Sequence, residues 1–258
     1  MRREKTNYII QSVSHALDVL EQFSGEHDEL GVTELSKRLK LHKNNVFRLL
    51  ATLESRGYIE QNKATENYRL GIGCLQLGQR FVAHMGLLQQ ARPIIESLAE
   101  DASETAFVAV LRKVCVVAVD AVEARHPIRM ASRIGEALPL HCTAAGKVQL
   151  ANISDADLRE ALTAGLPRFT ERTTTDQQKL QQQLRQIAEA GQAVELGEHI
   201  PDVHSIAVPI RDYTRNVVGS LAVSGPAYRM NAERIEKEIA PLLAKAGREL
   251  SSRLGYKA

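Results

Sequence analysis

The chain has 258 residues, 44% of them hydrophobic and 25% charged, and a formal net charge of +2, so its length suits one large domain or two smaller ones that each bury a core. The two longest unbroken apolar runs, Ala106–Leu111 and Val114–Val119, have six residues each, whereas a membrane-spanning helix needs roughly 20. No apolar stretch follows the basic residues at the start, which predicts no secretory signal, and the three cysteines lack any CxxC spacing, which favours a reduced, cytoplasmic compartment.

Three short helices are predicted in the first part of the chain. Ser12–Phe23 carries apolar residues at the i, i+3, i+4, i+7 spacing of a helix that buries one face, and Gly25 is expected to end it. A second helix begins at Val32–Leu35, with Thr33 as its expected N-cap. After a tight connection, a third helix that Gly57 ends places four apolar residues on one face: Val46, Leu49, Leu50 and Leu53.

A small hairpin and a longer helical stretch follow. The segments 58–61 and 67–70 have the composition of short strands around the polar turn 62–66. Short helix, turn, helix and hairpin, in this order, predict a winged helix-turn-helix. From residue 72 to 101 the pattern is helical again, with expected breaks near Gly86 and at Pro93. We interpret its first part as a linker helix and its second part as the start of another domain.

From Thr105 onward, predicted strands alternate with predicted helices, which indicates an α+β or mixed α/β domain. Thr143 is expected to cap a helix over Ala144–Ala151, and Ser154–Asp157 and Thr175–Gln178 resemble capping boxes at the starts of two more. A long helix that contains Pro241 closes the chain. The expected strands are Thr105–Leu111, Val114–Val119, Ile128–Ser132, Ser205–Ile210 and Val217–Val223.

A basic cluster marks the second and third helices. Between Leu35 and Leu53 the chain has five Lys or Arg residues and no Asp or Glu. Such cations bind the dense phosphates of duplex DNA with release of counterions, and Asn or Arg side chains can also bond base edges in the major groove. A solvated polar helix face is the alternative interpretation. The candidate DNA-contacting residues are Thr33, Lys43, Asn44, Asn45, Phe47, Arg48, Thr52 and Lys63.

Motifs in both halves of the chain match one known family in the same order. The first half has Val32–Ser36 (VTELS), Asn45–Leu53 (NVFRLLATL) with Gly57–Tyr58, and Tyr68–Gly71 (YRLG). The second half has Arg133–Gly135 (RIG), Pro139–Lys147 (PLHCTAAGK), Ser205–Ile210 (SIAVPI) and Gly219–Pro226 (GSLAVSGP). Together these motifs resemble the IclR-type bacterial transcription regulators, and the resemblance covers essentially the whole chain.

The resemblance implies an α+β protein with a winged helix-turn-helix domain at 1–71, a linker helix at 72–86 and a GAF-like, mixed α/β effector-binding domain at 87–258. Members similar to this chain act as dimers or dimers of dimers on palindromic DNA operators. Many repress and some activate, and they often control the catabolism of small organic acids, sugar acids or aromatic compounds. We therefore expect a cytoplasmic repressor of a catabolic operon that needs no cofactor and no membrane.

A ligand pocket is expected at the helix that Thr143 caps. Such a helix start carries partial positive charge and suits a carboxylate, and the N–H groups of Ala144, Ala145 and Gly146 are expected to be free there. The alternative is that Thr143 only caps a packed helix. The resemblance to the family places seven residues around this helix start, with the two serines as hydrogen-bonding groups: Leu138, Ala144, Ala145, Glu195, Val203, Ser205 and Ser224.

Catalytic and metal-binding motifs have no convincing spacing, so we expect neither an enzyme nor a metal. Ala144–Val148 lacks the leading Gly and the Ser or Thr of a phosphate loop, and GxSxG, HExxH and GxGxxG do not occur. The alternative function is a small-molecule-binding enzyme or carrier whose helical N-terminus only mediates oligomerisation. One group of residues on two distant segments raises the question of a metal site: His141, Cys142, Glu198, His199, Asp202 and His204.

Overall fold

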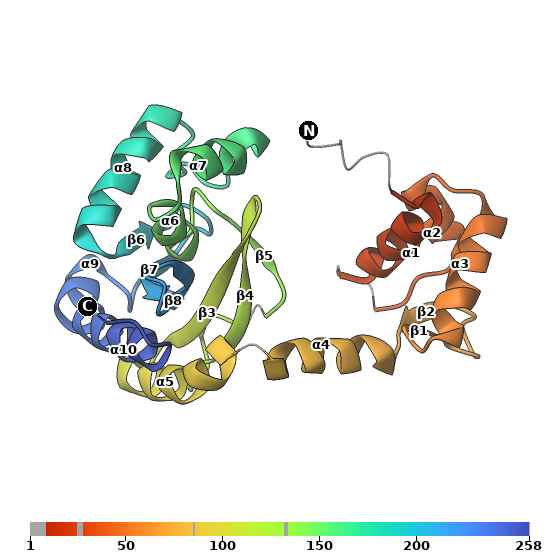
Figure 1. The fold of residues 1–258 in the computed structure, drawn as a ribbon, viewed down its shortest axis with the longest axis horizontal. Helices are drawn as coiled ribbons and strands as arrows, with labels where there is room; N and C mark the ends of the chain where they lie inside the picture. Colours follow the sequence, from red (N-terminus) through yellow and green to blue (C-terminus); the bar gives the residue numbers. More distant parts are fainter. Residues whose placement is uncertain (1–8, 25–27, 85, 132–133, 258) are drawn as a thin grey trace. The chain divides into compact units, whose positions relative to one another are not determined.

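The computed structural model describes residues 9–24, 28–84, 86–131 and 134–257 (Figure 1). Contacts within the chain divide it after His84 into two compact units, each with its own hydrophobic core. The elements of the first unit are α1 (Gln11–Glu21) with a 3-10 turn at Gln22–Ser24, α2 (Val32–Leu39), α3 (Lys43–Ser55), β1 (Ile59–Gln61), β2 (Tyr68–Leu70) and α4 (Ile72–His84).

The first unit is the predicted winged helix-turn-helix. The helices α1, α2 and α3 bury Val19, Leu35, Val46 and Leu50 in one core. Helical spacing predicts the buried face of α3, but the face expected to be buried on α1 is wrong in part, because Val13 and Leu17 are each 54% exposed. Lys40 adopts a left-handed conformation (φ 54°) at the end of α2, which makes the turn into α3 tight. The strands β1 and β2 pair antiparallel and form the wing.

Two details of this unit concern helix ends. The N-cap of α2 is Gly31 and not Thr33, which is the second residue of the helix, so the predicted cap is wrong. The helix begins early because Leu30 exchanges backbone hydrogen bonds with Tyr68 and Gly31 then accepts the N–H groups of the first turn. Gly57 follows α3 with a positive φ of 74°, as expected for the residue that ends a helix. The expected end of the first helix at Gly25 lies outside the described residues.

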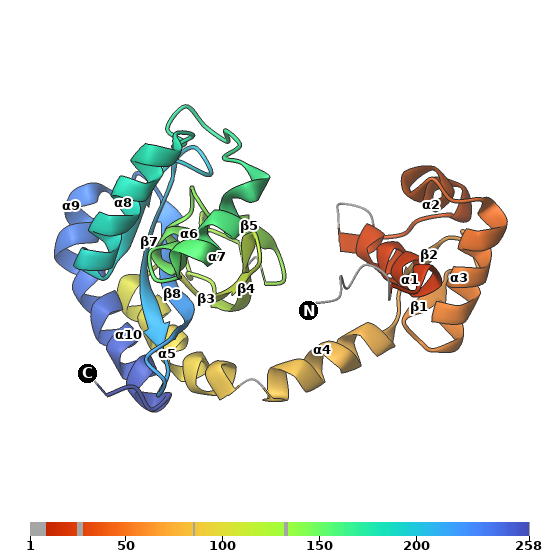
Figure 2. The same ribbon diagram turned by 45° about the horizontal axis from the view of Figure 1, so that its top comes forward.

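The second unit consists of one sheet with helices on both of its faces (Figures 1 and 2). Its strands are β3 (Thr105–Arg112), β4 (Cys115–Val122), β5 (Ala137–Pro139), β6 (Ala193–Leu196), β7 (Val203–Arg211) and β8 (Val217–Pro226). Its helices are α5 (Gly86–Ala102), α6 (Ala144–Leu150), α7 (Asp155–Ala161) with a 3-10 turn at Leu162–Ala164, α8 (Gln177–Ala190), α9 (Ala232–Arg234), a π-helical turn (Ile235–Ile239) and α10 (Ala240–Arg253).

The six strands lie in the order β5-β4-β3-β8-β7-β6, and each neighbouring pair is antiparallel. Successive residues of the central strands point to opposite faces of the sheet and pack in two separate cores. Val108, Ile206 and Leu221 pack with α5 and α10 on one face. Small residues such as Ala207 and Ala222 lie on the opposite face and let α6 approach the sheet closely. This architecture is the expected α+β fold, and the small residues bring the start of α6 next to the strands.

Three expectations about the second unit are wrong. Ile128–Ser132 forms no strand over its described residues 128–131, because side chains bind the carbonyls of Ile128 and Met130. Pro93 does not break α5, which continues because Ala91, Ile94 and Leu98 bury one face of it. The N-cap of α8 is Asp176, which accepts the N–H of Lys179, and not Thr175, the first residue of the predicted capping box.

Other elements match the prediction or were missed. Ser154 caps α7, Thr143 caps α6, and Gly191 ends α8 with a positive φ. Pro241 lies in the first turn of α10, directly after the π-helical turn, so a continuous helical run accommodates its missing N–H. The short edge strands β5 and β6 were not predicted, because three or four residues carry too little pattern to be identified as strands.

Candidate functional site

The candidate DNA-contacting residues gather on one side of α3. Val46, Leu50 and Leu53 face the core, and the polar residues lie outside that buried arc and are exposed. Phe47 is 57% exposed among them, so its ring lies where it can contact a partner. The exposed candidates on α3 are Lys43, Asn44, Asn45, Phe47, Arg48 and Thr52.

Two cations of this surface have no counter-ion among the described residues. Lys43 and Arg48 form no ion pair with the part of the chain that the structure describes, whereas Arg38 on α2 pairs with Glu34 at 2.6 Å. Thr52 donates its hydroxyl to the Arg48 carbonyl at 2.8 Å, so its oxygen can still accept a hydrogen bond. Thr33 is exposed at the start of α2, apart from the polar face of α3. This pattern of exposed donors without acceptors suits a polyanion.

The wing turn is built by side chains that the sequence did not single out. Glu29 accepts hydrogen bonds from Asn62 at 2.7 Å and from Thr65 at 2.9 Å, and these two bonds lower the pKa of Glu29. Asn62 also accepts the backbone N–H of Ala64 within the turn. Lys63 is exposed at the tip of this braced turn, and like Lys43 it has no ion-pair partner among the described residues.

In the second unit, all eight residues expected at the pocket line one cavity of about 60 Å³: Leu138, Thr143, Ala144, Ala145, Glu195, Val203, Ser205 and Ser224. Eight further lining residues were not predicted: Thr105, Phe107, Ala118, Ala121, Met130, Ala131, His199 and Ile200. By the same measure a single water needs roughly 10–15 Å³, so the cavity has room for a compact small molecule.

A row of polar residues crosses the sheet at this cavity. Thr105 on β3 pairs with Ser224 on β8, Ser224 pairs with Ser205 on β7, and Ser205 pairs with Glu195 on β6. Directly paired residues point to the same face of a sheet, so the four side chains form one line of hydrogen-bonding groups. Alternation within the predicted strands places Thr105 and Phe107 on one face, but only the strand register brings Thr105 beside Ser224.

The start of α6 forms one end of the cavity. The hydroxyl of Thr143 accepts the Gly146 N–H at 3.1 Å and donates to the Pro139 carbonyl at 2.6 Å. The expectation that the Gly146 N–H is free is therefore wrong, because the cap itself uses it. The N–H groups of Ala144 and Ala145 lie in the first turn and have no hydrogen-bond partner among the described residues. These two donors and the positive end of the helix remain for an anionic group.

Glu195 is the buried carboxylate of the cavity, with only 2% of its surface exposed. It accepts hydrogen bonds from the backbone N–H groups of Glu198 and His199 and from the hydroxyl of Ser205, which lies 3.0 Å away. Burial raises the pKa of Glu195, and the three hydrogen bonds oppose that shift. Among the described residues, the hydroxyl of Ser224 donates to the His204 carbonyl alone, at a long 3.5 Å, so it is available to a ligand.

A buried ion pair fixes the loop beside Glu195. Lys147 on α6 is 2% exposed, and its ammonium nitrogen lies 2.5 Å from an oxygen of Glu198. Glu198 belongs to the loop between β6 and β7, which supplies His199 and Ile200 to the cavity. The pair therefore ties one wall of the cavity to the helix that forms its end. Sequence reasoning considered Glu198 only as a metal ligand and did not assign a role to Lys147.

The residues that raised the question of a metal site do not form a metal-binding group in the described part of the chain. His141 bonds the Pro167 carbonyl and His204 bonds the Met230 carbonyl. Burial raises the pKa of Cys142 to about 12, so its thiol stays protonated and is a poor metal ligand. Among the described residues, no three His, Cys, Asp or Glu side chains form a group that could hold a metal ion. None of the helices among the described residues has the length and apolar character needed to cross a membrane.

Comparison with known proteins identifies the family. Residues 12–63 match the IclR helix-turn-helix domain, and residues 79–252 match the C-terminal domain described as bacterial transcriptional regulator IclR. The HTH-type transcriptional regulator KdgR of Escherichia coli K12 is 34% identical over 249 residues, which are 95% of this chain and 94% of KdgR.

Solved structures agree with this assignment. The IclR transcriptional regulator from Alicyclobacillus acidocaldarius has a TM-score of 0.86 at 25% identity, over 96% of this chain and 100% of that one. An IclR homolog from Microbacterium hydrocarbonoxydans, solved with 4-hydroxybenzoate, shares the fold with a TM-score of 0.84 at 24% identity, over 95% and 99% of the two chains. The chain belongs to the IclR family of bacterial transcriptional regulators, with a helix-turn-helix DNA-binding domain and the C-terminal domain of that family.

Proposed function

We propose that the protein is a ligand-responsive repressor of a catabolic operon and that it reads its operator with α3 and the wing. The observation that carries the proposal is the exposed face of α3, where Lys43 and Arg48 have no counter-ion among the described residues. Asn44 and Asn45 on the same helix have the groups that bind adenine, and Arg48 has those that bind guanine or phosphate. Lys63 and Thr33 contact neighbouring phosphates in this proposal.

We infer that the effector is a small acid with a hydroxyl group. Its carboxylate binds the free N–H groups of Ala144 and Ala145, at the positive end of α6. Its hydroxyl donates to Glu195 or bonds Ser205 and Ser224, because a second carboxylate beside Glu195 would be repelled. A protein of the same fold that holds 4-hydroxybenzoate supports this chemistry, since that molecule carries one carboxylate and one hydroxyl.

We also propose that the protein acts as a dimer or a dimer of dimers on a palindromic operator, in the cytoplasm. Apolar side chains that are each more than half exposed support this assembly: Ile10, Val13 and Leu17 at α1, and Ile72 and Leu75 on α4. In the proposed division, residues 1–71 bind DNA, 72–86 link and 87–258 bind the effector; Met85 lies outside the described residues. A two-fold assembly reads two half-sites at a fixed spacing, and the linker carries the effector's influence to that spacing.

The cavity is tested by thermal unfolding of the full chain with a panel of sugar acids, hydroxy acids and aromatic acids. The expected result is a subset of acids that raise the melting temperature in proportion to the logarithm of their concentration. A Thr143→Val/Ser224→Ala variant is expected to bind such an acid about 10-fold more weakly or worse, because it loses two hydroxyl groups at the cavity. Unchanged affinity in that variant would place the acid elsewhere.

The alternative, an enzyme or carrier with an oligomerising N-terminus, predicts turnover or no DNA binding, and the family assignment does not favour it.

A further inference from the structure

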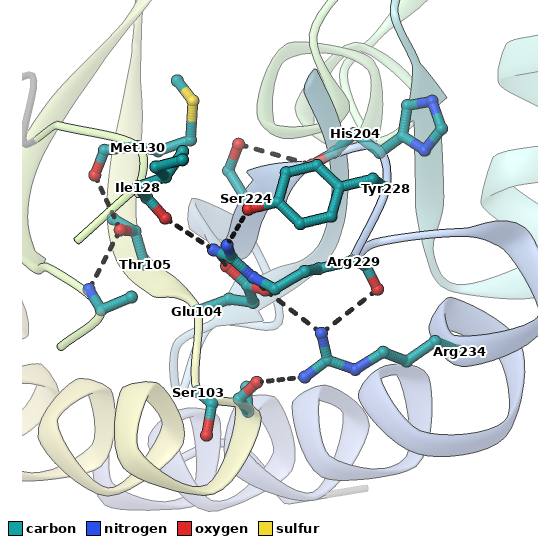
Figure 3. A network of polar contacts seen from close by, with 12 residues as sticks. Ser103, Glu104, Thr105, Ile128, Met130, His204, Ser224, Tyr228, Arg229 and Arg234 are labelled. Carbon is teal, nitrogen blue, oxygen red and sulfur yellow. Dashed lines mark hydrogen bonds and ion pairs between the residues drawn. The ribbon is translucent and has the colours of Figure 1, made fainter. Parts of the chain in front are cut away.

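A buried carboxylate lies at the junction of α5 and β3, on the residue that directly precedes the cavity-lining Thr105 (Figure 3). Glu104 is completely buried, and two arginines from the chain after β8 bind it. Arg229 donates from Nε and Nη2 to the two carboxylate oxygens at 2.7 and 2.8 Å, and Arg234 donates from Nη1 to one of them at 3.1 Å. The paired contact from Arg229 fixes the plane and the direction of its guanidinium group.

The guanidinium group of Arg229 also binds the segment 128–131, which contributes to the wall of the cavity. Nη2 of Arg229 donates to the Ile128 carbonyl at 2.9 Å, and the hydroxyl of Thr105 donates to the Met130 carbonyl at 2.8 Å. Met130 and Ala131 line the cavity, yet residues 123–131 form no strand. Two side chains therefore hold this wall where a sheet would use backbone pairs. Figure 3 shows both bonds reaching the segment from the same side, next to Ser224.

Arg234 also binds the Glu104 carboxylate, but it forms no hydrogen bond to the described wall segment 128–131. It also donates to the Ala102 carbonyl at the end of α5, at 2.8 Å, to the Arg229 carbonyl, at 3.2 Å, and to a carboxylate oxygen of Glu238, at 3.2 Å. The backbone of β8 leaves room for the cluster, since a Cβ atom on Gly225 would come within 2.4 Å of an oxygen of Glu104. Arg229 and Arg234 thus provide two equal charges on one carboxylate, of which Arg229 alone reaches the cavity wall.

We propose that Arg229 is a positioning residue for the effector cavity, which fixes the 128–131 wall through the Ile128 carbonyl while Glu104 orients its guanidinium. The inference rests on the proposed ligand-binding function and deepens it, because the position of Met130 then sets which acids fit. A lysine at this position keeps the charge, but its single ammonium group cannot span both carboxylate oxygens and the Ile128 carbonyl. The wall is then held by Thr105 alone.

The test compares Arg229→Lys with Arg234→Lys in the full chain, since both variants keep the charge and both lose a guanidinium on Glu104. Trypsin cleavage at the Arg129–Met130 bond, between the two held carbonyls, is followed by mass spectrometry, with the exposed Arg215–Asn216 bond of the β7–β8 turn as internal reference. We expect Arg229→Lys to speed cleavage at Arg129 at least 10-fold and Arg234→Lys to change it less than twofold. Cleavage at Arg215 is expected to stay unchanged in both.

Equal cleavage at Arg129 in Arg229→Lys and the wild type would overturn the proposal. So would equal acceleration in both variants, or at both bonds, because a merely structural cluster loosens the unit as a whole. If Arg229→Lys does not fold, Thr105→Val removes the other hold on the wall, and unchanged cleavage there contradicts the account. A loosened wall together with an acid panel that never binds would uphold the positioning role and refute the proposed effector class, so the two failures are distinguishable.

Discussion

On α3, Lys43 and Arg48 are exposed and have no ion-pair partner among the described residues, whereas in the cavity Glu195 is almost wholly buried and accepts three hydrogen bonds. The charges of Lys43 and Arg48 are solvated until a partner binds, whereas the charge of Glu195 is compensated by hydrogen bonds within the protein before any ligand enters. A charged protein surface that binds DNA can remain solvated without cost to folding, but a buried charge without partners would destabilise the domain. The two regions therefore differ in what a substitution does: on α3 it changes binding alone, and at the cavity it changes stability as well.

The largest effect is expected on the affinity for DNA, when cations of the α3 surface are removed. Lys43→Ala/Arg48→Ala is expected to weaken binding to a selected duplex by about 100-fold or more, because each side chain contributes roughly 1–3 kcal/mol through phosphate or base contacts. The slope of log affinity against log salt concentration is expected to become shallower by up to about 2. Fluorescence anisotropy at several salt concentrations measures both, and thermal unfolding is expected to stay as in the wild type.

The matched control is Lys245→Ala/Arg248→Ala, which removes two exposed cations from α10 of the second unit. If this control weakens DNA binding as much as the α3 variant, net charge rather than the α3 surface controls affinity.

A smaller effect is expected at the close contact beneath the cavity. A Cβ atom on Gly146 would lie 2.4 Å from the Leu140 carbonyl oxygen, so Gly146→Ala forces α6 away from the segment before it. We expect a loss of about 1–3 kcal/mol in the free energy of unfolding of the second unit, measured by urea denaturation. Gly86→Ala at the start of α5, in the same unit, is the control, because nothing lies within 4 Å of the new Cβ and a helical alanine stabilises by up to about 1 kcal/mol. The same sign in both variants would refute the contact.

The smallest expected effect concerns Glu195 and pH. Burial raises its pKa in the folded protein, so its contribution to stability is complete below the unfolded pKa and is lost as pH rises through the folded pKa. Glu195→Gln cannot ionise, and its stability relative to the wild type is expected to increase from about pH 4 upward and then to level off. Urea unfolding of both proteins from about pH 4 to about pH 8 measures this difference. A difference that does not vary with pH would show that the three hydrogen bonds cancel the effect of burial on the pKa, and a difference that decreases as pH rises would show that they outweigh it.

The two regions also differed in how far the sequence could predict them. Helical spacing and the chain order of motifs were enough for the winged helix-turn-helix, because Val46, Leu50 and Leu53 define one face of α3 by local geometry alone. The cavity depends on strand register, which places Thr105 beside Ser224 at a separation that no local pattern specifies. The segment 128–131 was predicted as a strand because its composition is strand-like, and the side chains that hold it, Thr105 and Arg229, lie far away in sequence.

The role of Glu104 was even harder to predict from the sequence, because its partners are distant in the chain. Its partners Arg229 and Arg234 lie 125 and 130 residues further along the chain, and an acidic residue at the end of a helix ordinarily indicates exposed surface. The N-cap at Thr143 was predictable because it depends on residues within one helical turn, whereas the use of the Gly146 N–H by that cap required the geometry.

The most direct test of the account is the affinity of the full chain for DNA with and without a cavity ligand. A duplex selected from random sequence by the protein is titrated by fluorescence anisotropy in the presence of saturating acid from the thermal panel. The account predicts a change in dissociation constant of about 5- to 150-fold, a weakening if the protein is a repressor released by its effector. In Thr143→Val/Ser224→Ala the same change is expected to need an acid concentration at least about 10-fold higher. An acid that binds the cavity but leaves the affinity for DNA unaltered would contradict the central claim that the two units are coupled.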